Sequence, residues 1–321
     1  MRRVLLVAIL TTCTVFCTTL STFAIGEETE NNIPPIPMNV VIIENYSHDS
    51  SAFTQGLIWH EGSLYESTGL YGNSSIREVN LSTGEVVRSV QLNASLFGEG
   101  LALVGENLVQ LTWKNNTAII WDLNNFTIVG NFTYDGEGWG LCNDGMNLIM
   151  SNGTDVLTVR DSLNFTIIRE INVTLNGTPQ ISLNELECNQ QYIWANIWGQ
   201  ESIVRINSTT GVIDQIIDAS ILLEDESING TGVLNGIAID GDGKFLLTGK
   251  NWPLLYRVEI VEVFDEELNQ SESNNQTIET GDKNTPSNRF SILLMLVVFA
   301  MIVATIMLIY KISRERQTDK G

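Results

Sequence analysis

The sequence predicts an all-β fold, a five-bladed β-propeller. One short phrase occurs five times: a mostly polar residue, then Gly or a small turn, then Leu or Ile, with a second apolar strand about seven residues later. Strand signals are dense between residues 38 and 263, whereas helix signals are weak. A repeat of roughly 40 to 50 residues that contains four strands is typical of a propeller blade.

The five copies of the phrase are regularly spaced. Measured between their apolar anchors, the steps along the chain are 44, 40, 45 and 51 residues. These anchors are Leu57, Leu101, Leu141, Leu186 and Ile237. In a propeller, the first residue of each phrase should lie at the mouth of one shared central pocket. These first residues are Gln55, Glu99, Trp139, Asn184 and Asn235.

Two further strands follow each inner pair. Apolar runs such as 75–79 and 202–206 predict a third strand, and turn signals then lead into β-branched fourth strands such as 127–129. The last copy lacks its own fourth strand, and residues 40–43 could supply it and close the ring. A β-sandwich also contains many short strands, but it does not predict the same phrase at a nearly constant offset.

Both ends of the chain carry apolar segments outside this repeat. Residues 1–24 combine Arg2 and Arg3 with an apolar run and a small-residue end, which predicts a signal peptide, with an uncleaved anchor helix as the alternative. Residues 290–310 are uncharged and long enough to cross the ~30 Å hydrocarbon core of a membrane. Basic residues follow in 311–321, and such residues stay on the cytoplasmic side. We therefore predict a single-pass protein of the cell membrane, anchored by its C-terminal helix, with the main domain outside the cell or in a lumen.

The remaining boundaries follow from composition. Residues 25–37 are polar and contain Pro, so we expect a linker before a propeller domain at 38–263. Residues 264–289 are acidic and poor in large apolar residues, which predicts a flexible stalk, and 311–321 would be a basic cytoplasmic tail.

Charge and modification signals narrow the partners. The formal net charge of −21 disfavours nucleic acid and anionic lipid, because both require basic patches. More than a dozen Asn-x-Ser/Thr triplets predict a glycosylated surface, although Asn and Thr are also common in turns and strands. Cys142 and Cys188 lie near inner strands of neighbouring copies, and either a disulfide or two buried thiols fits the sequence.

The sequence lacks the catalytic or metal-ligating residues that several classes of enzyme require. The chain has two histidines, His48 and His60, which cannot assemble a zinc site with several His ligands. It contains neither a Gly-x-Ser-x-Gly elbow nor a P-loop. A metal-dependent hydrolase and a nucleotide enzyme are therefore disfavoured.

A propeller would bring one set of polar and aromatic residues together. The phrases supply Gln55, Glu99, Trp139 and Asn184, the second inner strands end near three further residues, and two Phe residues precede the first two phrases. The additional residues are Trp113, Trp198, Lys250, Phe53 and Phe97. Aromatic walls with few polar groups are typical of a small-molecule or peptide-end pocket, and burial should raise the pKa of a lone Glu there. The same residues could instead cap turns, pack between blades or remain solvated.

The motifs in order resemble those of a known family. They include Phe53-Thr54-Gln55-Gly56-Leu57, Phe97-Gly98-Glu99-Gly100, Gly136-Glu137-Gly138-Trp139-Gly140-Leu141, Leu183-Asn184-Glu185-Leu186-Glu187 and Thr248-Gly249-Lys250-Asn251-Trp252-Pro253. From about His48 to Val258, the chain resembles the plant and bacterial type of glutaminyl-peptide cyclotransferase. This resemblance implies a five-bladed propeller that converts the N-terminal glutamine of peptides or proteins to pyroglutamate and releases ammonia, without a cofactor or catalytic metal.

The resemblance also implies roles for the pocket residues. Glu99 would be the catalytic carboxyl, and three polar residues would contact the substrate or transition state: Gln55, Asn184 and Lys250. The aromatic walls would be Phe53, Phe97, Trp113, Trp139 and Trp198. The competing hypothesis is a non-catalytic extracellular propeller that binds a ligand or protein partner through the same pocket, and an ammonia-release assay would distinguish the two.

Overall fold

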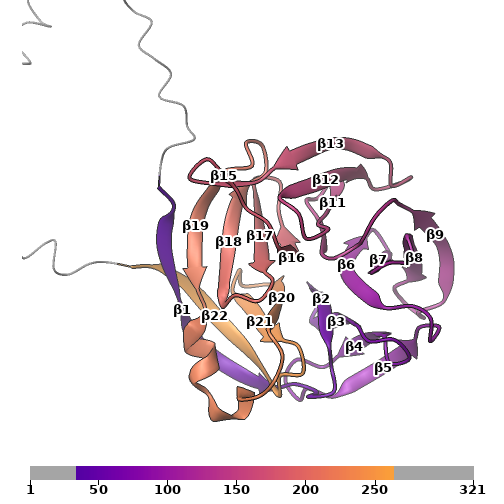
Figure 1. Cartoon of the computed structure of the whole chain (residues 1–321). Helices are drawn as coiled ribbons and strands as arrows, with labels where there is room; N and C mark the ends of the chain where they lie inside the picture. Colours follow the sequence, from indigo (N-terminus) through magenta and orange to yellow (C-terminus); the bar gives the residue numbers. More distant parts are fainter. Residues whose placement is uncertain (1–33, 264–321) are drawn as a thin grey trace, which may run out of the picture. The chain divides into compact units, whose positions relative to one another are not determined.

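The structure is a computed structural model that describes residues 34–263, and within this range it is all-β. The strands form sheets arranged around a centre, as in a propeller (Figure 1). Two short 3₁₀ helices are the helical elements of this range: η2 (Ser220–Glu224) and η3 (Glu226–Ile228). The predicted all-β class is confirmed.

Three antiparallel sheets contain four strands each, in sequence order. The first contains β2 (Thr54–His60), β3 (Ser63–Thr68), β4 (Ser75–Val79) and β5 (Val86–Gln91). The second contains β6 (Gly98–Val104), β7 (Asn107–Thr112), β8 (Thr117–Asp122) and β9 (Ile128–Thr133). The third contains β10 (Leu141–Asn143), β11 (Asn147–Met150), β12 (Val156–Asp161) and β13 (Ile167–Asn172).

The remaining long strands form one sheet of eight, in the order β16-β17-β18-β19-β1-β22-β21-β20. Its first part contains β16 (Leu183–Cys188), β17 (Tyr192–Ile197), β18 (Ser202–Asn207) and β19 (Ile213–Asp218). Its second part contains β20 (Leu234–Ile239), β21 (Phe245–Gly249), β22 (Leu254–Glu262) and β1 (Ile36–Ser47). A separate small hairpin contains β14 (Thr174–Leu175) and β15 (Thr178–Pro179). The predicted count of five blades stays a prediction, because hydrogen bonds join the last eight strands into one sheet.

The innermost strands all begin at the repeated phrase. In Figure 1, β2, β6, β16 and β20 lie nearest the centre. With β10 they contact one another in cyclic order, β2–β6–β10–β16–β20 and back to β2. This cyclic packing brings the starts of strands that are far apart in the sequence to one end of a common axis.

Strand β1 closes the ring from the N-terminal side. Residues Met38 to Ser47 pair antiparallel with β22, as predicted for residues 40–43. The start of β1 also pairs parallel with β19, with Ile36 opposite Gln215. The last two residues of the predicted linker therefore belong to this strand. One N-terminal strand thus supports both halves of the eight-stranded sheet.

A β-bulge interrupts four inner strands at the repeated phrase. The pairing register shifts at Gln55 in β2, at Glu99 in β6, at Asn184 in β16 and at Asn235 in β20. A bulge leaves a residue without a partner on the neighbouring strand and re-aims its side chain. The phrase therefore marks the points at which polar side chains turn away from the sheets and toward the axis.

Glycine lets these inner strands approach closely. A Cβ atom at Gly56 would lie 2.5 Å from the backbone nitrogen of Leu101, and one at Gly100 would lie 2.4 Å from that of Leu141. In the fourth phrase, Glu185 takes the glycine position. Its carboxylate accepts the backbone N–H groups of Leu57 (3.3 Å) and Ile237 (2.8 Å). The Glu185 side chain therefore fills the space near the axis at the position where the other inner strands make a close backbone contact.

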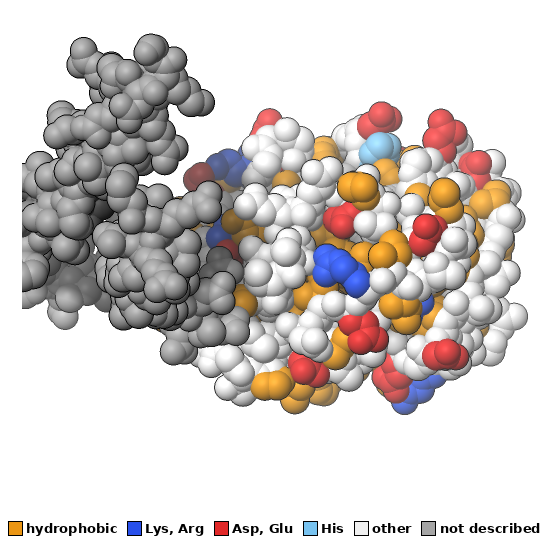
Figure 2. Space-filling view, turned by 90° about the horizontal axis from the view of Figure 1, so that it is seen from above, with side chains coloured by type: hydrophobic (Ala, Val, Ile, Leu, Met, Phe, Trp, Pro, Cys, Tyr) orange, Lys and Arg blue, Asp and Glu red, His pale blue; other side chains and the backbone are white. Residues whose placement is uncertain are grey.

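Apolar clusters fill the spaces between neighbouring sheets. One such cluster contains Ile149, Leu157, Val204 and Ile206. Cys142 in β10 and Cys188 in β16 form a disulfide across the same boundary, with a Cα–Cα distance of 5.7 Å. This answers the question that the sequence left open. Figure 2 shows acidic side chains scattered over one face with fewer basic ones, as the net charge of −21 implies.

The predicted signal peptide (1–24), stalk (264–289), membrane helix (290–310) and tail (311–321) lie outside the described residues. Within residues 34–263, the structure contains no helix that is both long and apolar enough to cross a membrane.

Candidate active site

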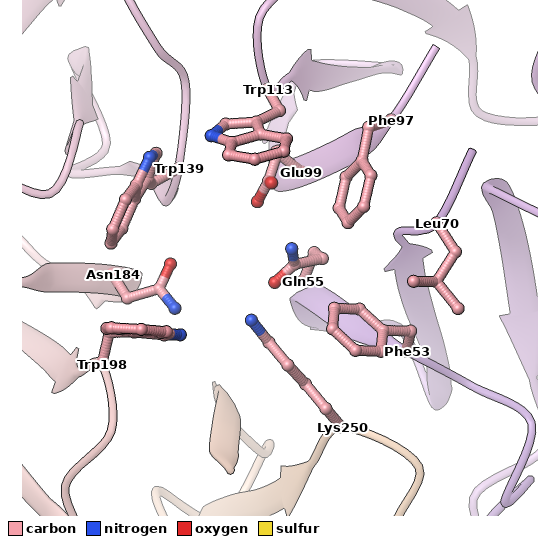
Figure 3. A pocket seen from close by; sticks show the side chains of 10 residues that line it. All are labelled: Phe53, Gln55, Leu70, Phe97, Glu99, Trp113, Trp139, Asn184, Trp198 and Lys250. Carbon is pink, nitrogen blue, oxygen red and sulfur yellow. The ribbon is translucent and has the colours of Figure 1, made fainter. Parts of the chain in front are cut away.

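A cavity of about 510 Å³ opens where the inner strands begin. The structure places nine of the ten residues predicted at the pocket around it, all except Asn235, together with Leu70, which was not predicted (Figure 3). The lining residues are Phe53, Gln55, Leu70, Phe97, Glu99, Trp113, Trp139, Asn184, Trp198 and Lys250. Five of these ten residues are aromatic, one is Leu, and the other four have polar side chains.

The aromatic walls contact one another edge to face. The Phe97 ring packs against Phe53 (6.1 Å between centroids) and Trp113 (5.6 Å), and Trp139 packs against Trp198 (6.4 Å). Such T-shaped pairs contribute about 0.5–1.5 kcal/mol each beyond the area they bury. Trp198 is 54% exposed, so this ring forms the outer edge of the box.

Two glycines fit directly against these walls. A Cβ atom at Gly69 would lie 2.3 Å from Cε1 of Phe97, and one at Gly153 would lie 2.7 Å from the Trp139 ring. Leu70 follows Gly69 with a φ of 84°, which is unusual for a residue with a side chain. The positions of both rings are therefore set by the absence of side chains behind them.

Glu99 supplies the carboxyl of the cavity. It is 5% exposed, and its side chain makes no hydrogen bond to another described residue. Burial raises the pKa of Glu99 well above its usual value, Lys250 opposes this, and the charge of Glu137 adds to it. Such a carboxyl can hold or release a proton at moderate pH.

Lys250 enters from the opposite side, after β21, and its ammonium points into the same space as the Glu99 carboxyl (Figure 3). Its Nζ lies 4.9 Å from the centre of the Phe53 ring. Burial lowers the pKa of Lys250 to about 8, although Glu99 partly offsets this. The pair forms no salt bridge within 4.0 Å, so both groups remain available to a bound molecule.

Asn235 was expected at the pocket mouth, and this expectation was wrong. It lies behind the cavity, fully buried, and hydrogen-bonds to both lining amides. Its Oδ1 accepts from Nδ2 of Asn184 (2.8 Å), and its Nδ2 donates to Oε1 of Gln55 (3.2 Å) and to the Thr54 carbonyl (2.9 Å). This arrangement leaves Nε2 of Gln55 as a donor and Oδ1 of Asn184 as an acceptor on the cavity side.

Glu137 is a further residue of this site for which no role was predicted. One of its carboxylate oxygens accepts the indole N–H groups of both Trp113 (2.7 Å) and Trp139 (3.0 Å). Its position within the motif beside Trp139 was visible in the sequence, but its contact with Trp113 depends on the fold.

Neither histidine lines the cavity. His48 lies between Glu66 (3.1 Å) and the Trp252 carbonyl (2.8 Å), and His60 lies near Glu61 at 3.9 Å. Within the part of the chain that is described, no group of three His, Cys, Asp or Glu residues is placed to hold a metal ion.

Comparison with known proteins identifies the family. A family model described as glutamine cyclotransferase matches residues 13–260. The chain belongs to the glutamine cyclotransferase family. It is 40% identical over 227 residues to a glutaminyl-peptide cyclotransferase of Arabidopsis thaliana, covering 69% of this chain and 71% of that protein. It is also similar to the crystal structure of Myxococcus xanthus glutaminyl cyclase, with 37% identity, a TM-score of 0.67, and coverage of 72% of this chain and 100% of that one. The resemblance seen in the motifs is confirmed.

Proposed function

We propose that this protein is a glutaminyl-peptide cyclotransferase that converts the N-terminal glutamine of peptides or proteins to pyroglutamate and releases ammonia. Membership of the family supports the activity. The observation that carries the chemistry is the buried Glu99 carboxyl inside an aromatic box that has one ammonium and two amides as its other polar groups.

The box favours the reaction by holding one conformer. The α-amine of the substrate attacks the side-chain amide carbon of the same residue, a C–N bond forms, and the bond to the amide nitrogen breaks. Well-oriented intramolecular attack can reach effective molarities of about 10⁵–10⁸ M. A cavity of about 510 Å³ with edge-to-face aromatic walls can select the curled glutamine side chain in which the two groups meet.

Glu99 moves the proton. The attacking amine must be neutral, and the pKa of a free α-amine is roughly 7.7–8.0. Glu99 as a carboxylate takes a proton from the amine and then delivers it to the departing nitrogen, which leaves as ammonia. Its raised pKa suits both steps, because a group that transfers a proton in both directions works best with a pKa near the working pH.

The three polar residues have different tasks. Gln55 can donate from Nε2, and Lys250 donates from Nζ, so both can stabilise the oxyanion that develops on the amide carbonyl. Asn184 offers its Oδ1, which makes no hydrogen bond to a described residue, whereas Asn235 takes one of the two N–H groups of its amide. We assign Asn184 to hold the substrate amine by accepting a hydrogen bond, rather than to the oxyanion.

Ammonia release from a Gln-initiated dipeptide tests this function. Glu99→Gln should retain the fold and lose roughly 10²–10⁴-fold in turnover, the usual contribution of general acid–base catalysis. A dipeptide with glutamine in the second position is the substrate control and should release no ammonia. Unchanged turnover in the variant would exclude the acid–base role, and binding without ammonia release by the native chain would favour a non-catalytic module.

We propose that the reaction needs no metal. Glu99 is the one carboxylate among the lining residues, and neither histidine lines the cavity. Full activity should therefore persist after exhaustive treatment with a chelator. A complete loss that added zinc restores would contradict this assignment.

We also propose that the eight-stranded sheet is two blades joined by β1, which makes five blades in all. The cyclic order of the inner strands supports this count.

We propose in addition that the domain is exported and anchored by residues 290–310. The apolar segments with their basic flanks support this arrangement. Protease added to intact cells should remove the propeller but spare a tag after residue 321. Protection of the propeller would contradict this orientation.

A further inference from the structure

We propose that Glu137 is a positioning residue that sets two aromatic walls of the cavity, the indoles of Trp113 and Trp139, through a single carboxylate oxygen. This inference rests on the proposed function, since it concerns how that box is held. Oε2 of Glu137 accepts from Nε1 of Trp113 at 2.7 Å and from Nε1 of Trp139 at 3.0 Å. In Figure 3 the two indole nitrogens lie on the ring edges that face each other.

The carboxylate joins two otherwise separate aromatic groups. On one side, Phe53, Phe97 and Trp113 contact one another in a row, and on the other side Trp139 contacts Trp198. No direct ring contact joins Trp113 and Trp139 in the part of the chain that the structure describes. The two hydrogen bonds to Glu137 therefore complete the aromatic wall between them.

Glu137 is itself held in place. Its Oε1 lies 3.3 Å from Nζ of Lys114, and that ammonium sits 3.8 Å from the centre of the Trp113 ring. The backbone of the segment is fixed on both sides: the Gly138 N–H donates to the Trp113 carbonyl at 3.0 Å, and the Gly136 carbonyl accepts from Asn116 at 2.9 Å. A side chain 38% exposed to solvent is thus fixed by two hydrogen bonds and one ion pair.

Glu137 also acts on Glu99 by its charge. The titratable groups whose charges couple to that of Glu99 are Lys250, Glu137 and Tyr134. Burial raises the pKa of Tyr134 to about 12, so this phenol is neutral in the working range. Lys250 lowers the pKa of Glu99, and Glu137 raises it. Removing the charge of Glu137 should therefore shift the acid limb of kcat/KM to lower pH.

Three variants of the full-length chain separate the two effects. Glu137→Ala removes the acceptor and the charge, and hydrogen bonds to a charged group typically correspond to a roughly tenfold to hundredfold effect, so we expect a loss of that size in kcat/KM. Glu137→Gln keeps an acceptor oxygen, so it should recover most of this loss while the acid limb stays shifted. Glu106→Gln is the matched control, because it removes one exposed charge at the far end of β6 and should change neither quantity.

Binding measured without turnover separates this inference from the proposed function. In a Glu99→Gln background, the affinity for a Gln-initiated dipeptide can be followed by tryptophan fluorescence, and adding Glu137→Ala should weaken it. If the dipeptide does not bind to the background variant at all, the proposed function fails. If it binds equally with and without Glu137, the positioning role is overturned. Equal impairment of Glu137→Ala and Glu137→Gln with no shift of the acid limb would also overturn it.

Discussion

The buried carboxylate of Glu66 offers a quantitative test of how the ring is closed. Glu66 is fully buried and accepts hydrogen bonds from Nε of Arg77 (2.8 Å), Oγ1 of Thr54 (2.6 Å) and Nε2 of His48 (3.1 Å). The other ring nitrogen of His48 faces the Trp252 carbonyl at 2.8 Å. Burial opposes the charge of His48, but Glu66 outweighs it and raises the pKa of the ring, which favours an imidazolium that donates to both acceptors.

The pKa of Glu66 gives the magnitude. Burial alone would raise it, but His48 and Arg77 together lower the pKa from 4.5 to about 2. At about 1.36 kcal/mol per unit, this corresponds to roughly 3 kcal/mol of stability. Because the pKa is lowered in the fold, this contribution is present above about pH 4.5 and is lost as the pH falls toward 2. About 2 kcal/mol of it should be gone at pH 3.

Glu66→Gln should therefore lower the free energy of unfolding by roughly 3–5 kcal/mol at pH 7, because it removes the buried carboxylate that Arg77, Thr54 and His48 share and leaves Arg77 with Asp49 as its ion-pair partner. The difference from the native chain should narrow by about 2 kcal/mol at pH 3. Denaturant titrations followed by tryptophan fluorescence at both pH values measure this. Glu259→Gln is the control, since its exposed pair with Lys244 should contribute less than about 1 kcal/mol. A Glu66 variant within 1 kcal/mol of the native chain at pH 7, or a gap that does not narrow, would refute the reasoning.

Three further predictions concern the axis and the walls. Replacing Cys142 and Cys188 with Ser should cost up to about 4 kcal/mol, because the bond closes a loop of 46 residues; thermal unfolding with and without reductant measures this. Gly153→Ala should raise KM, because its methyl group would lie 2.7 Å from an indole wall; Gly62→Ala, with a similar φ of 90° but open space around it, should leave KM unchanged. Glu185→Ala leaves two buried N–H groups unpaired, and each should lower the free energy of unfolding by about 1–3 kcal/mol. Burial raises the pKa of Glu185 and also raises the pKa of Glu187 to about 7, so native stability should fall as the pH rises through these pKa values. Glu185→Gln should weaken this dependence in denaturant titrations, and the part due to Glu187 should remain.

Much of the fold was predictable because the repeat carries local information. The alternation of apolar residues and the turn residues after each third strand predicted strands at 75–79 and 202–206, where β4 and β18 occur. The return of residues 40–43 to pair with β22 followed from a missing partner at the end of the chain. The parallel contact of Ile36 with Gln215 could not be predicted, because no short-range pattern records it.

The set of cavity residues was predictable, but their directions were not. Gln55 and Glu99 begin the same phrase as Asn235, yet the bulges turn the first two to the cavity while Asn235 remains behind it. The disulfide could not be predicted from the sequence either, because two thiols face each other only when the two neighbouring sheets are placed exactly. Leu70 lines the cavity only because the backbone adopts a φ of 84° there.

The layer behind the cavity decides what the lining can do. An amide can donate or accept, so Gln55 and Asn184 alone do not specify a reaction. Asn235 accepts one N–H of Asn184 and donates to Oε1 of Gln55, so it fixes the two amides in opposite orientations, with Nε2 of Gln55 and Oδ1 of Asn184 not engaged by it. In the reaction proposed above, the attacking amine needs an acceptor and the developing oxyanion needs a donor, and one buried side chain orients the two amides for these tasks. The same reasoning applies to Glu137, whose carboxylate engages both indole N–H groups and leaves those walls as apolar surfaces. Catalytic polarity in this cavity therefore depends on residues that never touch the substrate.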